Sequence, residues 1–295
     1  MYEDIKRNKI KTGVVVSAFL VMISFVIYFV CYMLDLGELS LIIALVFSVI
    51  STFATYYNCD KIVLASVHAR EATREEDLQL TNILDALMIT ADIPVKPRLY
   101  VVDSNQPNAF ATGRNPENAI ICVTTGLLEK LDYYELEGVI AHELAHVKNY
   151  DIRLSAVLSV MVGFVVMISD FCLRSNFRRH RDRDDDNNSA NVIALLIGLV
   201  FTILSPIFSE IIQMAVSRRR EFLADATAIG FTRNPNGLIS ALEKLDADDN
   251  ILETSSKSNA HMYIVTPLKN KRGKSNLFST HPTIEERVEA LRNLS

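Results

Sequence analysis

The stretch IAHELAHVKNYD, residues 140–151, places two histidines four positions apart, with a glutamate directly after the first. On an α-helix, residues i and i+4 lie one turn apart on the same face, so His142 and His146 can present two imidazoles to one cation. Glu143 is displaced by about 100° around the helix, so it can miss the metal and still reach a water bound there. The pattern H-E-x-x-H therefore predicts a zinc-binding helix with its own general base. The alternative is a solvated polar face on an ordinary helix.

The residues before the H-E-x-x-H motif predict that the motif lies on a helix. Asp132 precedes the helical pattern and Glu135 follows three positions later, which is the spacing of a capping box. A strand is expected to begin near Arg98, and two extended segments follow it, PNAFATG (107–113) and NAIICVTTG (118–126), so we expect a small sheet. Residues 58–92 contain neither Gly nor Pro and mix apolar and charged residues at helical spacing, which predicts a helix.

A third metal ligand is expected on a second helix. Catalytic zinc typically keeps three protein ligands and one open position. In SRRREFLADATA, residues 217–228, Glu221 and Asp225 stand four positions apart. Glu221 can complete a site with two histidines and one glutamate, and Asp225 can accept the free N–H of a ligating histidine. The alternative is that both acids only pair with the arginines at 218–220 on a surface near the membrane.

Apolar residues make up 49% of the 295-residue chain and are concentrated in four blocks. Residues 13–34 and 39–57 carry no charge, and each is long enough to cross a hydrocarbon core of about 30 Å. The third block, residues 154–169, is shorter than the first two and is followed by Asp170. The fourth block, residues 192–208, contains Pro206. The last two blocks either span the membrane or form a shallow re-entrant or buried pair.

The basic N-terminus predicts the orientation of the chain. Four Lys and Arg residues precede the first block, which is too long for a signal-peptide core, so it is expected to be a retained anchor with a cytoplasmic start. Residues after Tyr57 then lie on the cytoplasmic side. Glu221 must lie on the same side of the membrane as His146 if both bind one metal. The two later apolar blocks lie between these residues, and they cross the membrane twice if both span it or not at all if neither does. Either case leaves the two residues on the same side. The metal is expected within about 10–20 Å of the bilayer surface.

Other segments point to loops and to a closing helix. Residues 174–189 form a highly charged connection, residues 246–276 form a polar loop, and residues 281–294 form a helix. Three further histidines, His68, His180 and His261, are expected to face solvent. The four cysteines form no C-x-x-C pair, which disfavours a disulfide framework or a cysteine zinc site. No basic patch with interleaved aromatics is present, so no nucleic-acid partner is expected.

Four motifs together resemble a known family. HELAH, SRRREFLADA, NAFATG and LFSTHPTIEERV occur in the order and spacing of the HtpX-like membrane zinc metalloproteases, relatives of the Ste24 proteases, over nearly the whole chain. The resemblance implies an α-helical membrane protein whose mainly helical α+β, zincin-like catalytic domain carries a small β-sheet. It further implies a cell-membrane protein with its catalytic domain facing the cytoplasm, one Zn²⁺ per chain, and misfolded membrane proteins or unfolded polypeptides as substrates.

The resemblance also implies roles for individual residues. The family's zinc ligands correspond to His142, His146 and Glu221, and its general base corresponds to Glu143. Asp225 corresponds to the family's acid that hydrogen-bonds to a ligating histidine. The family's other functional positions fall on two segments. Asn108 and Ala109 match the sheet edge that holds an extended substrate, and His281 and Arg287 match groups near the scissile carbonyl. The alternative for His281 is that its segment only caps the last helix.

The expected organisation has four parts. Residues 1–57 form a transmembrane hairpin, residues 58–151 the first part of the catalytic domain, residues 152–214 a second apolar hairpin, and residues 215–295 the second part of the catalytic domain. A competing function is a non-proteolytic membrane adaptor or chaperone with structural zinc, which requires a closed site with four ligands. A transporter would carry charges or paired Gly/Pro breaks within its spans. Three ligands beside a glutamate favour a zinc metalloendopeptidase.

Overall fold

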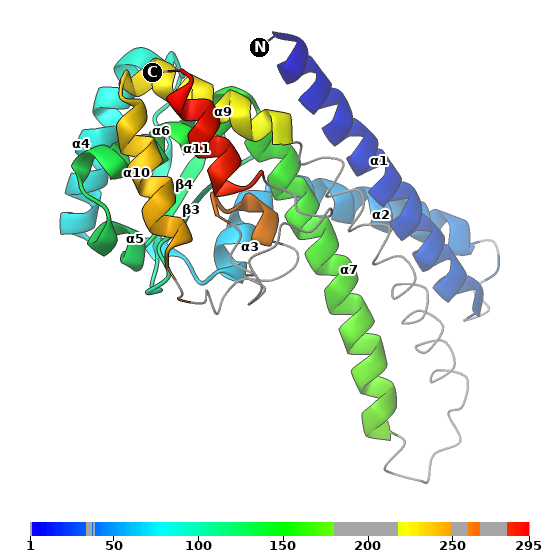
Figure 1. The fold of residues 1–295 in the computed structure, drawn as a ribbon. Helices are drawn as coiled ribbons and strands as arrows, with labels where there is room; N and C mark the ends of the chain where they lie inside the picture. Colours follow the sequence, from blue (N-terminus) through cyan, green and yellow to red (C-terminus); the bar gives the residue numbers. More distant parts are fainter. Residues whose placement is uncertain are drawn as a thin grey trace.

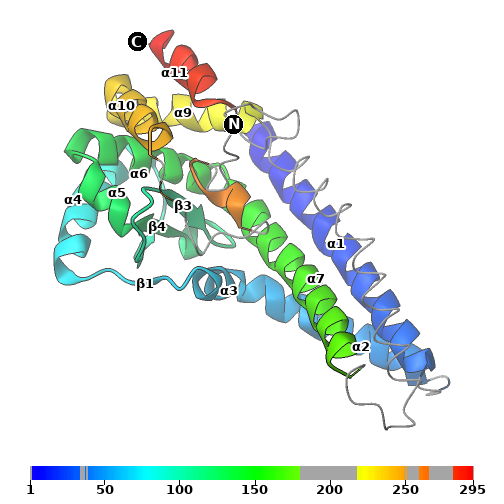
Figure 2. The same cartoon turned by 60° about the horizontal axis from the view of Figure 1, so that its bottom comes forward.

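The computed structural model describes residues 2–33, 37, 39–179, 218–248, 250, 259–265 and 282–294. A helical body surrounds a small sheet, and three long helices extend from it, α1 (Tyr2–Met33), α2 (Leu39–Tyr57) and α7 (Asp151–Arg179) (Figures 1 and 2). The other helices are α3 (Cys59–Ser66), α4 (Arg74–Ala91), α5 (Thr125–Lys130), α6 (Tyr133–Lys148), α9 (Arg218–Thr232), α10 (Pro235–Asp246) and α11 (Ile284–Arg292). The apolar block 192–208, His180 and His281 lie outside the described residues.

Among the residues that the structure describes, two helices are long and apolar enough to cross a membrane, as the sequence predicts. The candidate spans are Lys6–Phe29 within α1 and Leu39–Tyr57, and these two helices pack against each other. Large apolar side chains such as Phe25, Phe47 and Ile50 are exposed on their outer surfaces. A contiguous apolar surface of this kind is costly in water and suits a lipid environment.

Helix α7 contains the third apolar block, residues 154–169, and extends ten residues beyond its last residue. The helix continues to Arg179, so the first residues of the predicted charged connection at 174–189 are helical. The side chains of Leu154, Ala156 and Leu158 are buried, because α7 packs against α1 and α3 and one face of the sheet. This part of the third block is therefore covered by protein.

The sheet has four strands in the order β1-β2-β4-β3, formed by β1 (Arg70–Glu71), β2 (Arg98–Val102), β4 (Ile120–Thr124) and β3 (Ala109–Thr112). β2 and β4 are parallel, whereas β1 and β3 pair antiparallel with their neighbours. Every residue of β4 is buried, because α4 and α6 cover one face of the sheet and α3 and α7 cover the other. A strand buried on both faces has the continuous apolar sequence seen at 120–123.

The prediction of one helix over 58–92 is wrong. The chain leaves helix α3 after Ser66, His68 adopts a left-handed φ of 54°, and β1 then pairs with β2 before α4 begins. Thr73 starts α4 by accepting the backbone N–H of Glu76, whose carboxylate accepts the N–H of Thr73 in return. This second capping box in the sequence is the signal that a new helix starts there.

Helix α6 passes through the centre of the body, and its start agrees with the sequence. Asp132 and Glu135 form the predicted capping box. The Glu135 carboxylate also accepts hydrogen bonds from Ser240 (2.6 Å) and Lys244 (2.6 Å) of α10. Burial alone raises the pKa of Glu135, but these bonds outweigh burial and lower it, so the group stays ionised and joins α6 to α10.

Close contact between α6 and α10 depends on a glycine. A Cβ atom at Gly138 would lie 2.8 Å from the backbone nitrogen of Leu238 and 2.9 Å from its Cα atom. Gly138→Ala is therefore expected to push the helices apart and lower the free energy of unfolding by about 1–3 kcal/mol. Gly230→Ala is the matched control, because nothing lies within 4 Å of its Cβ position, and it should stabilise α9 by about 0.5–1 kcal/mol. Thermal unfolding of both purified variants measures the difference, and equal melting temperatures would contradict this packing account.

Candidate active site

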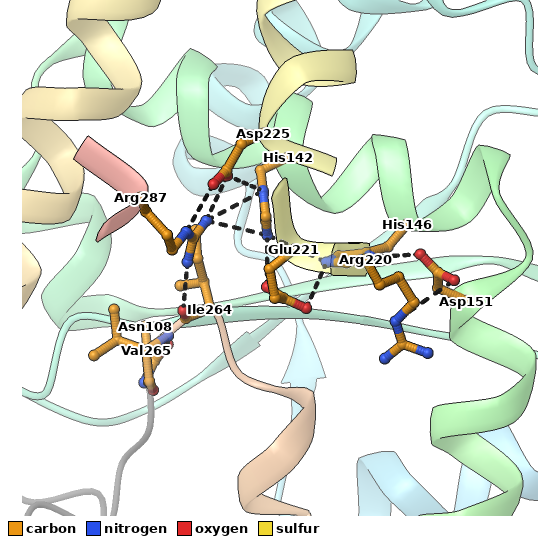
Figure 3. A network of polar contacts seen from close by, with 10 residues as sticks. All are labelled: Asn108, His142, His146, Asp151, Arg220, Glu221, Asp225, Ile264, Val265 and Arg287. Atoms are coloured by element: carbon orange, nitrogen blue, oxygen red, sulfur yellow. Dashed lines mark hydrogen bonds and ion pairs between the residues drawn. The ribbon is translucent and has the colours of Figure 1, made fainter. Parts of the chain in front are cut away.

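Two helices bring three metal-ligating side chains together. His142 and His146 lie one turn apart on α6, and Glu221 lies in the first turn of α9, which packs along α6 (Figure 3). Ligand atoms of the three residues all lie within 4.8 Å of one another. His142 and Glu221 are buried, and His146 is partly accessible. The helix spacing predicted from the sequence thus produces a convergent cluster.

The distances within the cluster fit one tetrahedral ion. The Nε2 atoms of His142 and His146 are 3.2 Å apart, and they lie 3.6 and 3.7 Å from the two carboxylate oxygens of Glu221. Ligand atoms at about 2.0–2.1 Å from a tetrahedral zinc ion are separated by about 3.3–3.5 Å. Two imidazoles and one carboxylate at this spacing can bind one ion and leave a coordination position open.

The other ring nitrogen of each histidine faces a carboxylate. Nδ1 of His142 lies 2.9 Å from Asp225 Oδ1, and Nδ1 of His146 lies 2.9 Å from Asp151 Oδ2. A carboxylate at Nδ1 keeps the proton on that nitrogen, so the Nε2 lone pair remains available for a metal. The two acids therefore orient both imidazoles toward the same point.

Charge in the site also suits a divalent cation. Buried carboxylates outnumber the cationic side chains around the site; the groups are Glu143, Asp151, Glu221 and Asp225 against Arg220, Arg287 and Lys11, which interacts with Asp151. An unbalanced buried charge is costly unless it is paired or coordinates a metal. The donor types, their spacing and this charge all fit a divalent metal ion.

Asp225 belongs to a fully buried ion pair. Arg287 of α11 donates to both Asp225 oxygens at 2.6 and 2.8 Å and to the carbonyl oxygen of Ile264 at 3.1 Å, and its Nη2 lies 3.3 Å from His142 Nδ1. Burial raises the pKa of Asp225, but Arg287 and His142 outweigh it, so its pKa is below the ordinary value. In this structure Arg287 supports Asp225 and His142 from behind.

Asp225→Asn is expected to weaken metal binding by about 10–100-fold, because it removes the charge that orients His142 and leaves Arg287 without its buried partner. Competition with a chromophoric chelator measures the dissociation constant. Asp85→Asn serves as the control, since Asp85 is exposed and pairs with Lys96 on the surface. Equal metal affinity in the Asp225 and Asp85 variants would show that Asp225 does not support metal binding.

Glu143 lies beside the metal-ligand cluster in a confined space. Its carboxylate is buried, and burial raises its pKa above the ordinary value although the two histidines partly offset this effect. Together with His146 and Glu221 it lines a cavity of about 20 Å³, which has room for about one water molecule. A more basic carboxylate next to such a water is suited to proton transfer.

The prediction that His261 faces solvent is wrong. His261 is 5% exposed, lines the same cavity as Glu143, and its Nε2 lies 3.4 Å from the carbonyl oxygen of Ser155 on α7. Its neighbours Met262 and Tyr263 pack onto the sheet and α7. This segment is polar in sequence, yet its contacts with α7 and the sheet bury it. His68, in contrast, is exposed.

The edge of β3, where Asn108 and Ala109 are predicted to bind substrate, is paired with another part of the chain. The N–H of Ile264 donates to the carbonyl oxygen of Ala109 at 3.0 Å. Asn108 Nδ2 donates to the carbonyl oxygen of Val265 at 2.8 Å (Figure 3). The carbonyl oxygen of Ala109 is therefore already hydrogen-bonded within the chain. A substrate that pairs with Ala109 in this way has to displace Ile264.

Asp151 was not among the residues predicted for the site. It is the first residue of α7 and lies five positions after His146, and the intervening Tyr150 has a left-handed φ of 60°. This turn brings the start of α7 back toward the end of α6 and directs the carboxylate at His146. An acid directly after the end of the metal-binding helix is a signal that the sequence does contain.

Comparisons with known proteins agree with one another. Residues 74–295 match peptidase family M48. The chain is 43% identical over 291 residues to a Dictyoglomus thermophilum protein named Protease HtpX homolog, covering 99% of this chain and 94% of that protein. A protein of the same name from Thermoanaerobacter pseudethanolicus is 40% identical over 298 residues, covering 100% and 98% of the two chains.

A solved structure shares the fold. The crystal structure of S. mikatae Ste24p aligns with a TM-score of 0.50 at 18% sequence identity, covering 99% of this chain and 67% of that one. Likeness at this level of identity concerns the fold. It agrees with the predicted fold class, an α-helical protein whose mainly helical domain carries a small sheet.

Proposed function

This chain belongs to peptidase family M48 and is a membrane-associated metallopeptidase, and we propose that its metal is zinc and that it cleaves misfolded or damaged membrane proteins. The observation that carries the proposal is the convergence of His142, His146 and Glu221 on one point at tetrahedral spacing. Two imidazoles and one carboxylate with an open position are typical of catalytic zinc sites.

The proposed chemistry assigns Glu143 as the general base. When bound, zinc supplies Lewis acidity that lowers the pKa of a coordinated water to about 7 and polarises a peptide carbonyl. Glu143 accepts the proton of the attacking water and then donates it to the leaving amine. Its burial beside His146 and Glu221 supports this assignment, because a raised pKa makes the carboxylate a better proton acceptor.

We further propose how the substrate is positioned. Asn108 and Ala109 hold an extended polypeptide at the edge of β3, and the contact between Ala109 and Ile264 supports this because it uses the same backbone groups. His281 is proposed to lie near the scissile carbonyl. Arg287 acts by holding Asp225 and His142, since it is fully buried behind them.

The membrane arrangement that we propose has several spans and a catalytic domain on the cytoplasmic side. The basic start of α1 supports this orientation. The metal site lies close to the membrane helices, because Asp151, which contacts His146, is the first residue of α7 and also contacts α1. A site next to the bilayer is accessible to segments that emerge from the membrane, which favours membrane proteins as substrates.

The competing function is a non-proteolytic adaptor with structural zinc. A measurement of peptide-bond cleavage distinguishes this adaptor from a metallopeptidase. The parental protein, purified in detergent, is expected to cleave casein, to lose this activity with a chelator, and to regain it when zinc is added back. Cleavage that a chelator leaves unchanged would contradict the metal-dependent mechanism. Bound zinc without cleavage of casein or of an unfolded membrane protein would favour the adaptor.

A further inference from the structure

The first membrane helix makes a buried polar contact with the metal site. Asn8 of α1 is 5% exposed, although it lies in the basic segment that precedes the uncharged block 13–34. Its side-chain Nδ2 donates to Asp151 Oδ1 at 2.6 Å and to the carbonyl oxygen of Asn149 at 3.2 Å. Both acceptors belong to the junction between α6 and α7, more than 140 positions away in the sequence.

Asp151 divides its two oxygens between the metal site and the membrane helix. Oδ2 lies 2.9 Å from Nδ1 of His146, and Oδ1 accepts the hydrogen bond from Asn8 and lies 3.6 Å from Nε of Arg220. Asp151 is 1% exposed, so these buried contacts help to fix the rotation of its carboxylate. The orientation of His146 therefore depends on a group that Asn8 holds in place.

A second contact attaches α1 to the same junction. The Nζ atom of Lys9 lies 4.3 Å from the ring centroid of Tyr150. Tyr150 is the left-handed residue that separates α6 from α7. For a residue other than glycine this conformation has a cost, and contacts from neighbouring elements must maintain it. Residues 8 and 9 of α1 thus contact all three residues of the junction, 149–151.

We propose that Asn8 is a positioning residue for the metal centre, acting on His146 through Asp151. A side-chain amide suits the role because its N–H₂ group donates to a buried carboxylate without adding charge. Metal affinity then depends on the docking of α1 against the α6–α7 junction, which links the membrane anchor to the active site. The inference rests on the proposed zinc site.

Zinc affinity of the full-length, detergent-purified protein tests the proposal without relying on activity. Asn8→Leu is expected to raise the zinc dissociation constant by about tenfold, the lower end for loss of a group that supports a ligand. Asn58→Leu is the matched control, because Asn58 is exposed and its side chain donates only to the carbonyl oxygen of Ala54, four positions earlier at the end of α2. The control should bind zinc within about twofold of the parental protein.

A double-mutant cycle tests the route through Asp151. Asp151→Ala should weaken zinc binding by about 10–100-fold, and adding Asn8→Leu to it should change the affinity by less than about twofold. If Asn8→Leu weakened binding equally in both backgrounds, Asn8 would act by another route and the proposal would be wrong.

Asn8→Asp provides a second variant in case Asn8→Leu does not fold. It keeps the size of the side chain but replaces the amide donor with a carboxylate next to Asp151, so a weaker affinity is again expected. If the parental protein binds zinc and both Asn8 variants bind it with the same affinity, this inference is wrong, but the proposed function still stands. A parental protein that binds no zinc would contradict the proposed function as well.

Discussion

Glu143→Gln is expected to bind zinc as the parental protein does and to lose cleavage by about 10²–10⁴-fold in kcat. Glutamine keeps the size and the hydrogen-bonding reach of the side chain but cannot accept the proton of the attacking water. The metal should remain because the ligand atoms of His142, His146 and Glu221 lie close together independently of Glu143. Metal analysis and casein cleavage on one preparation measure both properties.

The control for this variant is Glu129→Gln. Glu129 is exposed on the short helix α5, so the same change in charge there should leave both zinc content and cleavage unchanged. A Glu143→Gln protein that cleaved casein at the parental rate would show that another group accepts the proton.

His146→Ala is expected to lose zinc and cleavage together. The substitution removes one of the two imidazoles and leaves Asp151 without the ring that it orients. Two protein ligands do not form the three-ligand site typical of catalytic zinc. The expected preparation contains well under one zinc ion per chain and has no chelator-sensitive cleavage.

His68→Asn is the matched histidine control. His68 is exposed, and its left-handed φ of 54° is one that asparagine tolerates better than alanine does. This variant should keep parental zinc content and cleavage. Full zinc content in His146→Ala would contradict its assignment as a ligand, provided that the variant melts at a temperature close to that of the control.

The features predicted correctly from the sequence are those with a short-range signal. The capping box of Asp132 and Glu135 marks the start of α6, and the strand-forming segments around 98–126 form the sheet. The i, i+4 spacing of His142 and His146 depends on one helix, so it specifies their geometry directly.

The errors arise where distant contacts decide the outcome. His261 lies in a stretch of polar composition, but packing against Ser155 and the sheet buries it. By sequence, Asn8 belongs to the basic start before an apolar block, which assigns it no partner. Its partner Asp151 is 143 positions away, and no local pattern pairs them. The break after Ser66 differs, because it does have a local signal: Thr73 and Glu76 form the capping box that starts α4.

The most direct test of the account is the zinc content of the full-length protein and of Glu143→Gln, measured together with cleavage before and after chelation. We expect one zinc ion per chain in both proteins and chelator-sensitive cleavage in the parental protein alone. Absence of zinc from both proteins would contradict the central claim that His142, His146 and Glu221 form a catalytic zinc site.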